Sequence, residues 1–400
     1  MKSTFLLVPF VGLVFCSTTF ACSNEATPAG DALGDASVDA SVDAPQVQTN
    51  EDPPLSAPPT PAPSKIAVTD GHACVVFDGA VKCFGTNLYG QFGVKDDTNK
   101  VPFTRPLTTV PGIGDAVEVG VSSGKTCARH ADGTVSCWGV NRYGGLGAPA
   151  TVPCGHNDSE LCRMEPQKVA GLANVVKIAI SDSKSCALLA DGTMKCWGGG
   201  SPAATGELRQ VPFAERLVDI GFLRTDLCGV TTSKTVRCFS HGDTKRPKPL
   251  SAKPNGPPLE GLTAVPVGIG SLGPEVVLQR GAQVSQGAAM APFGAVSRVV
   301  SGGQFACALL EDGAARCWGS PLGDVLGFTG PTRSVNGDVD IQIENATQIS
   351  AAPATDIAVT GRWGCVLVGR SVTCWGRPNV EPTAVRPGQT GTPIYYDIRL

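Results

Sequence analysis

The sequence predicts an all-β protein, a β-propeller of seven blades that follows a signal peptide and a disordered linker. Glycine and proline make up 49 and 32 of the 400 residues. Both interrupt regular elements, so short strands joined by turns fit this composition better than long helices. One strand–turn–strand pattern with two cysteines recurs six times after residue 65, and the first 64 residues contain no copy of it.

Each copy of the pattern has an apolar strand, a cysteine, a short turn, a second cysteine and an aromatic residue, usually followed by glycine. Four of the five tryptophans are such aromatic residues. The cysteine pairs are Cys74 and Cys83, Cys127 and Cys137, Cys186 and Cys196, Cys228 and Cys238, Cys307 and Cys317, and Cys365 and Cys374. Self-similarity at this period is typical of propellers and solenoids.

The turn residues place each cysteine pair within one β-hairpin. Asp78-Gly79 between the first pair suits a two-residue type I′ turn, and the longer second copy has Ala131-Asp132-Gly133, with glycine at the left-handed position. Loop length and cysteine separation change together, so the two cysteines stand opposite each other, where Cα atoms ~4.5 Å apart suit a disulfide. We predict one disulfide in every hairpin; buried free thiols are the alternative.

An insertion at 148–166 follows the second copy and holds Cys154 and Cys162. With His156 and an acidic residue between them, these cysteines could supply four metal ligands. The other interpretation is a loop tied by a disulfide, which makes seven disulfides from fourteen cysteines. We predict the disulfide, with no metal and no cofactor in the protein.

One copy carries a longer signature, which runs from Gly124-Lys125-Thr126-Cys127-Ala128 through Asp132–Gly139 to Asn141–Gly147. It resembles a repeat of the regulator of chromosome condensation family, in a bacterial-type secreted or lipoprotein form with one cysteine pair per repeat. The same tail recurs at Asn87–Gly93. The resemblance covers roughly residues 65–390 and implies a seven-bladed propeller. It implies no single function, because members include a nuclear exchange factor for a small GTPase and secreted protein inhibitors.

The blade count depends on the longest gap between copies, from Cys238 to Cys307. We expect a degenerate blade without cysteines near 262–295; six blades with a long insertion is the alternative. Pro-x-x-Val follows several copies and recurs at Pro382–Val385. This last segment is expected to pair into the first blade and close the ring, which removes open sheet edges. Residues 391–400 are then a C-terminal tail.

The N-terminus indicates export. Residues 1–21 have a lysine, an apolar run too short to span a bilayer and small residues before Cys22, as in a signal peptide. Thr19-Phe20-Ala21-Cys22 resembles a lipobox, which predicts lipidation at Cys22; cleavage without lipid is the alternative. Residues 22–64, rich in Ala, Pro, Asp and Ser, are expected to form a disordered, lipid-anchored linker. We therefore expect an exported lipoprotein at the outer membrane or cell surface, or else a secreted or periplasmic protein.

No catalytic pattern stands out. Gly120-Val121-Ser122-Ser123-Gly124 matches a nucleophile elbow but lies between two expected strands, and that motif needs a strand–turn–helix context. We predict a non-catalytic, monomeric binding module for a protein or glycan partner at the cell envelope, with insertion 148–166 as the contact element. A net charge of −3 argues against nucleic acid.

Two other functions are alternatives to a binding module. A propeller enzyme acting on extracellular polysaccharide would assemble its carboxylates from several blades, and a convergent acidic cluster in the centre would favour it. An apolar, aromatic-rimmed face would instead favour a protein partner. Guanine-nucleotide exchange, implied by the nuclear family member, conflicts with export because the GTPase is cytosolic.

Overall fold

The computed structural model describes the chain from residue 65 onward with gaps: residues 65–94, 104–155, 158–199, 206–223, 225–239 and, with further short gaps, most of 247–319, 333–376 and 395–400. The signal peptide, Cys22, the linker and Pro382–Val385 lie outside the described residues. No helix of the described part is long and apolar enough to cross a membrane.

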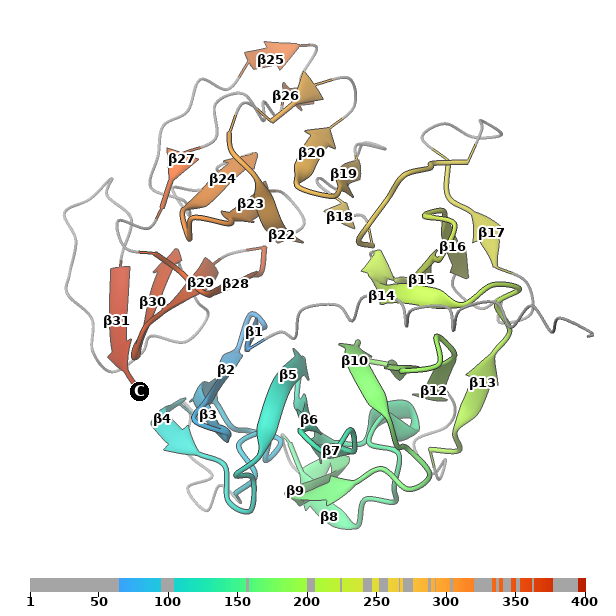
Figure 1. The fold of residues 1–400 in the computed structure, drawn as a ribbon. Coiled ribbons are helices and arrows are strands. Elements are labelled where there is room, and N and C mark those ends of the chain that lie inside the picture. Colours follow the sequence, from blue (N-terminus) through green and yellow to red (C-terminus); the bar gives the residue numbers. More distant parts are fainter. Residues whose placement is uncertain are drawn as a thin grey trace, which may run out of the picture. The chain divides into compact units, whose positions relative to one another are not determined.

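The described residues form antiparallel sheets, nearly all of them built from strands consecutive in sequence (Figure 1). The first sheet contains β1 (Ile66–Val68), β2 (His72–Phe77), β3 (Ala80–Thr86) and β4 (Thr104–Thr109). The second contains β5 (Ala116–Ser122), β6 (Lys125–His130), β7 (Val135–Val140), β9 (Glu160–Lys168) and β8 (Val152–Cys154), with the short 3₁₀ helix η1 (Arg142–Gly144) after β7. The third contains β10 (Val175–Ile180), β11 (Lys184–Leu189), β12 (Met194–Gly198) and β13 (Arg209–Val211).

The later sheets repeat this order. The fourth contains β14 (Leu217–Leu223), β15 (Asp226–Thr231), β16 (Val236–Phe239) and β17 (Lys248–Pro249), and the fifth contains β18 (Val267–Gly268), β19 (Val276–Arg280), β20 (Gln283–Gln286) and β21 (Ala289–Met290). The sixth contains β22 (Val296–Ser301), β23 (Phe305–Leu310), β24 (Ala315–Gly319) and β27 (Thr347–Gln348), beside a separate ribbon of β25 (Arg333–Val335) and β26 (Asp338–Asp340). The last contains β28 (Asp356–Val359), β29 (Trp363–Val368), β30 (Ser371–Gly376) and β31 (Tyr395–Arg399).

The first strands of neighbouring sheets contact one another, so the sheets follow each other around a common centre as in a β-propeller (Figure 1). Six sheets have the four strands of a propeller blade, where the sequence predicted seven such blades, and the sheet of β5–β9 has five strands. Residues 262–295, which lack cysteines, contain the fifth sheet, which has four strands. The all-β propeller class is confirmed.

The expected closure of the ring by strand exchange is not what the described residues do. The first sheet is completed by its own β4, and no described strand pairs the first sheet with the last. The stretch expected as a tail contributes β31, which pairs with β30 and completes the last sheet. Consecutive strands pair because each short connection keeps them close, which costs less chain entropy than pairing across the whole chain.

Disulfides link the second and third strands of the six cysteine-bearing sheets. The registers place Cys74 opposite Cys83 and Cys127 opposite Cys137, for example, with Cα atoms 4.1 Å apart in each pair. Six of the seven bonds are those predicted from the hairpin registers: Cys74–Cys83, Cys127–Cys137, Cys186–Cys196, Cys228–Cys238, Cys307–Cys317 and Cys365–Cys374. The seventh is Cys154–Cys162, the pair predicted within the insertion. This many disulfides indicates an oxidising compartment.

The core lies between sheets, where the repeat's tryptophan reaches the preceding sheet. Trp138 is fully buried, and its indole N–H donates to the carbonyl of Gln91, 2.8 Å away. Trp197 does the same to Gly145 at 2.9 Å. Both acceptors lie in the Asn-led tail of the repeat, where the Asn87 side chain binds the loop backbone at Phe92 N. The repeat signature therefore holds the second sheet to the first and the third to the second.

Candidate functional site

A charged residue stands nine positions before the first cysteine of each hairpin. These residues are Lys65, Glu118, Lys177, Asp219, Arg298 and Asp356, with signs that alternate along the chain. The spacing is constant because the first cysteine of each hairpin pairs with an innermost-strand residue seven positions earlier, as Cys127 does with Gly120. All six therefore lie at one level of the innermost strands, and we call them the charged collar.

The acidic members of the collar join one sheet to the next. Asp356 lies in the last sheet, and its Oδ2 accepts hydrogen bonds from the backbone N–H groups of Lys65 at 2.6 Å and Ile66 at 3.0 Å in the first. Asp219 accepts one from Val265 N at 2.9 Å, and Glu118 accepts one from Ile178 N at 3.4 Å. The last and first sheets are thus linked by a side chain in place of a strand.

The basic members pair with these acids across the sheets. Lys177 forms an ion pair with Asp219, and Arg298 Nη1 lies 2.6 Å from Asp356 Oδ1. Glu118 instead pairs with Arg129 of its own sheet, 2.7 Å away. Burial raises the pKa of Glu118, and the hydrogen bond from Arg129 opposes that shift. Because each acid is already bound by cations and backbone N–H groups, none is available as a general acid or base.

One position of the collar is neutral. Val265 N–H donates to Asp219 in the same way that Ile178 N–H donates to Glu118 and Ile66 N–H donates to Asp356. The residue before each of those donors is a collar lysine, Lys177 or Lys65, so Ala264 holds the equivalent position in the fifth sheet. The alternation of charge is interrupted there.

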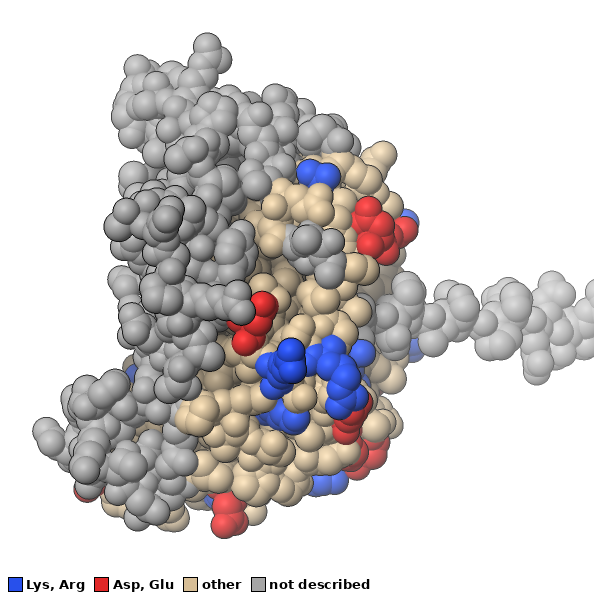
Figure 2. Space-filling view, turned by 90° about the vertical axis from the view of Figure 1, so that its left-hand side faces the viewer, with Lys and Arg blue, Asp and Glu red and all other residues tan. Residues whose placement is uncertain are grey.

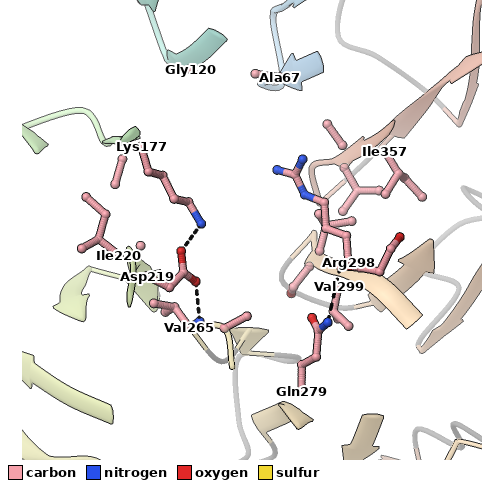
Figure 3. Close-up of a pocket in the computed structure, with 18 of the residues that line it drawn as sticks. Ala67, Gly120, Lys177, Asp219, Ile220, Val265, Gln279, Arg298, Val299 and Ile357 are labelled. Atoms are coloured by element: carbon pink, nitrogen blue, oxygen red, sulfur yellow. Dashed lines mark hydrogen bonds and ion pairs between the residues drawn. The ribbon is translucent and has the colours of Figure 1, made fainter. Parts of the chain in front are cut away.

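The collar surrounds a cavity of about 800 Å³ lined by the innermost strands. Figure 3 shows Lys177 and Arg298 extending toward its centre from opposite sides, with Gln279 below Arg298. Their side chains are 21% and 28% exposed, whereas Asp219 and Asp356 are 4% exposed. In these two pairs the cation is therefore the more exposed partner, and the carboxylate of exposed Glu311 also lines the cavity.

A second candidate site is the ribbon of β8 and β9, which falls in the insertion singled out from the sequence. The disulfide Cys154–Cys162 crosses it, so the metal-ligand interpretation of these cysteines is wrong. No group of three or more metal-ligating side chains occurs in the described part of the chain. Arg142 anchors the ribbon through Glu160, 2.7 Å away, and stacks over Tyr89 with its guanidinium carbon 5.3 Å from the ring centre.

Two large apolar side chains are exposed among the described residues, one on β9 of this ribbon and one on η1 beside it. They are Tyr143 and Leu161, each 45% exposed. They are neighbours in the fold, because the carbonyl of Leu161 accepts a hydrogen bond from Asn141 N at 2.9 Å, two residues from Tyr143. Tyr143 has a φ of 59°, a left-handed conformation that is unfavourable for a tyrosine.

The remaining polar motifs have structural roles. Ser123 of the elbow-like motif lies at the turn between β5 and β6, where its hydroxyl donates to Asp182 at 3.0 Å. Burial lowers the pKa of His72 to about 3, so this histidine is neutral. Lys125, at the equivalent position of the next repeat, is buried and donates to Ser185 Oγ at 2.9 Å. Burial lowers its pKa to about 7.

Basic side chains also gather on the side of the molecule where β31 and β4 lie (Figure 2). At the junction of the last and first sheets, the Arg370 guanidinium lies 4.6 Å and the Lys82 ammonium 5.6 Å from the Phe77 ring centre. Arg370 also approaches Asp78 at 3.7 Å. These cation–π and ion-pair contacts account for the charges at this junction, and we assign no ligand to it.

Sequence reasoning identified the cysteines and the insertion but missed the collar. Its signal is present in the chain, as a charge of alternating sign at fixed distance from each first cysteine. Tyr143 was noted only as part of a repeat signature, and its exposure depends on the ribbon beside it.

Two stretches of the chain match models of the regulator of chromosome condensation (RCC1) repeat, at residues 132–188 and residues 296–321. Among solved structures, yeast RCC1 (Prp20) bound to Kap60 is similar at 15% identity, over 84% of this chain and 80% of that chain, with a TM-score of 0.46. Human WBSCR16 is similar at 17% identity, over 74% of this chain and 69% of that chain, with a TM-score of 0.43. The ectodomain of the Arabidopsis thaliana receptor kinase ACR4 is similar at 17% identity, over 80% of this chain and 97% of that chain, with a TM-score of 0.47.

The two repeat matches agree with the cysteine hairpins, since each falls on one or two of them. The propeller-like arrangement of the sheets agrees as well. The chain therefore carries repeats of the regulator of chromosome condensation family, in a form with a disulfide in each of several repeats.

Proposed function

We propose that the protein is a non-catalytic binding module that recognises a protein partner through the β8–β9 ribbon. The observation that carries this proposal is the exposure of Leu161, on a ribbon held by a disulfide, beside exposed Tyr143 on η1. Tyrosine is one of the residues that most often anchor a protein interface, and the exposed leucine beside Tyr143 extends the apolar surface around it. They lose little conformational freedom on binding because the support is already ordered.

Two further observations support binding over catalysis. The three collar acids are each bound by a cation and a backbone N–H group, so they are not free to act as the pair of catalytic carboxylates that a polysaccharide-cleaving enzyme needs. Tyr143 adopts a left-handed φ that glycine would adopt without strain. A strained side chain at an exposed position is consistent with selection for contact rather than for stability.

A photo-crosslinking amino acid at position 161 tests the proposal in cells that export the protein. Position 210 is the matched control, because Gln210 is also exposed and lies on β13, the outer strand of the neighbouring sheet. We expect one discrete adduct from position 161 that Tyr143→Ala weakens, and no such adduct from position 210. Equal adducts from both positions, or none from position 161, would contradict a binding ribbon.

We also propose that the ring has seven blades, with the five-stranded sheet as the seventh. Strands β5, β6, β7 and β9 follow the order of the four-stranded sheets, and β8 is an addition at the outer edge. The collar supports this count, because an odd number of positions cannot alternate in charge all the way round. A ring of seven accommodates six alternating charges and one neutral position, and Ala264 is that neutral position.

Finally, we propose that the protein is exported and held by lipid on Cys22 at the outer membrane or cell surface, with residues 22–64 as its tether. The signal-like residues 1–21 and the seven disulfides support this location. Metabolic labelling with a palmitate analogue should mark the wild type and not Cys22→Ala. Equal labelling of both would exclude the anchor.

A further inference from the structure

Two loops of the fold are built alike and carry a tyrosine at the same position. The side chain of Asn87 accepts a hydrogen bond from the backbone N–H five positions later at 2.9 Å, and that of Asn141 accepts one at 3.0 Å. Each asparagine also donates to the carbonyl seven positions later. Tyr89 and Tyr143 each follow their asparagine by two positions. The surroundings of Tyr89 therefore show what a tyrosine at this position of the loop binds.

The second sheet covers the ring of Tyr89. Arg142 stacks on it, with the guanidinium carbon 5.3 Å from the ring centre, and its Nη2 donates to the tyrosine hydroxyl at 3.2 Å. Glu160 holds the guanidinium in place through an ion pair of 2.7 Å. Gly124 lies so close that a Cβ atom there would be 2.6 Å from a ring carbon. Tyr89 thus combines a cation–π contact with close packing on glycine.

The third sheet, as far as it is described, does not cover Tyr143 in this way. Ser183 holds the position of Gly124, because both stand three positions before a first cysteine and both carbonyls accept the backbone N–H two positions after the repeat's tryptophan. Since serine has a Cβ atom where Gly124 has none, a ring oriented as that of Tyr89 would overlap it. Tyr143 is 45% exposed, and no described side chain stacks on it or shares a hydrogen bond with it.

The third copy of the repeat also lacks the arginine that such a cover needs. The residues after the repeat's tryptophan and glycine are Val140-Asn141-Arg142 in the second copy and Gly199-Gly200-Ser201 in the third. The insertion that supplies Glu160 has no counterpart in the shorter third copy. One of two equivalent tyrosines therefore has a face that another molecule can cover.

We propose that the protein partner places an arginine over the Tyr143 ring, as Arg142 lies over Tyr89, with an apolar side chain next to it on Leu161. Arginine recognition rests on the proposed function of the ribbon and adds the chemistry of the partner. A guanidinium offers both a planar face for the ring and N–H donors for the hydroxyl, which an uncharged apolar segment does not. The partner's contact segment is therefore both basic and apolar.

Fluorine NMR of the protein labelled with 3-fluorotyrosine tests the proposal, since the chain has only four tyrosines and the signal of Tyr143 is identified by its loss in Tyr143→Phe. The probe is the peptide acetyl-Leu-Arg-Leu-amide. The same peptide with citrulline in place of arginine is the matched control, because citrulline keeps the planar end group and loses the charge. We expect the arginine peptide to shift the Tyr143 signal, to leave the covered Tyr89 unshifted, and to bind at least about threefold more tightly than the citrulline peptide. Equal affinity for the two peptides would overturn the role of the cation, and an unshifted Tyr143 signal would overturn the site.

Two variants separate the aromatic face from apolar bulk, with affinities measured by the fluorescence anisotropy of labelled peptides. Tyr143→Phe keeps an aromatic ring and should keep the preference for the arginine peptide, whereas Tyr143→Leu keeps only apolar surface and should lose it. Retention of the preference in Tyr143→Leu would overturn the proposal. The adduct at position 161 reports partner binding whatever the charge of the partner, so failure of arginine recognition is distinguishable from failure of the binding ribbon.

Discussion

Replacement of Asp356 by alanine should destabilise the domain more than any surface substitution, because this carboxylate links the last sheet to the first. The change removes two hydrogen bonds from backbone N–H groups of Lys65 and Ile66 and the ion pair with Arg298. It also leaves Ile66 N–H buried without that acceptor. Deleting one partner of a buried charged network costs about 3–5 kcal/mol. Arg298 is 28% exposed, so solvent screening places the expected loss near the lower end, about 3 kcal/mol.

Urea unfolding followed by tryptophan fluorescence measures this loss. Asp356→Asn keeps an oxygen acceptor for the two N–H groups and should lose less stability than the alanine variant, since only the charge disappears. Asp78→Ala is the matched control, because Asp78 pairs with Arg370 in solvent, with both side chains more than 70% exposed. If Asp356→Ala unfolds at the same urea concentration as Asp78→Ala, the side-chain link between the last and first sheets contributes nothing and the reasoning fails.

Three further predictions follow from named groups. Burial lowers the pKa of Lys125 from its ordinary value of 10.5 to about 7. Between pH 7 and pH 10 the unfolded chain therefore binds one proton more than the folded protein at this side chain, so the free energy of unfolding should rise with pH. Melting temperatures measured across this pH range should show the rise in the wild type and not in Lys125→Met. Non-reducing peptide mapping should find every disulfide within one hairpin or within the ribbon, and Cys186→Ala/Cys196→Ala should still fold, because a short closed loop contributes only ~2–3 kcal/mol; a dominant bond between different repeats would refute the hairpin registers. Deletion of residues 395–400 removes β31 and exposes the edge of β30, so the shortened protein should aggregate, as light scattering would reveal; an unchanged monomer would show that this strand is dispensable.

The fold could be predicted from the sequence because local signals determine each hairpin. Asp78-Gly79 and Ala131-Asp132-Gly133 specify turn lengths, and turn length places the cysteines opposite each other, so fold class and disulfide partners follow from short-range geometry. The Cys-free stretch near 262–295 was recognised from the spacing of its neighbours. Closure was predicted wrongly because it depends on contacts across nearly the whole chain. The link from Asp356 to Lys65 and Ile66 leaves no pattern within either segment.

The candidate sites were only partly accessible to sequence reasoning for the same physical reason. The insertion with Cys154 and Cys162 stood out as an interruption of the repeat, but exposure of Tyr143 and Leu161 depends on how the ribbon packs on Tyr89 and Arg142. The collar residues are ordinary charges in the sequence. They acquire meaning only when innermost strands from different repeats surround one cavity.

The central claim is that the ribbon binds a protein partner, and the most direct test is titration of the partner captured at position 161 against purified variants. Leu161→Asp should weaken the affinity at least about tenfold, because a charge replaces an apolar anchor at the interface. Gln210→Asp adds the same negative charge on β13, the outer strand of the neighbouring sheet, and should bind the partner as tightly as the wild type does. Unchanged affinity in Leu161→Asp would contradict the claim.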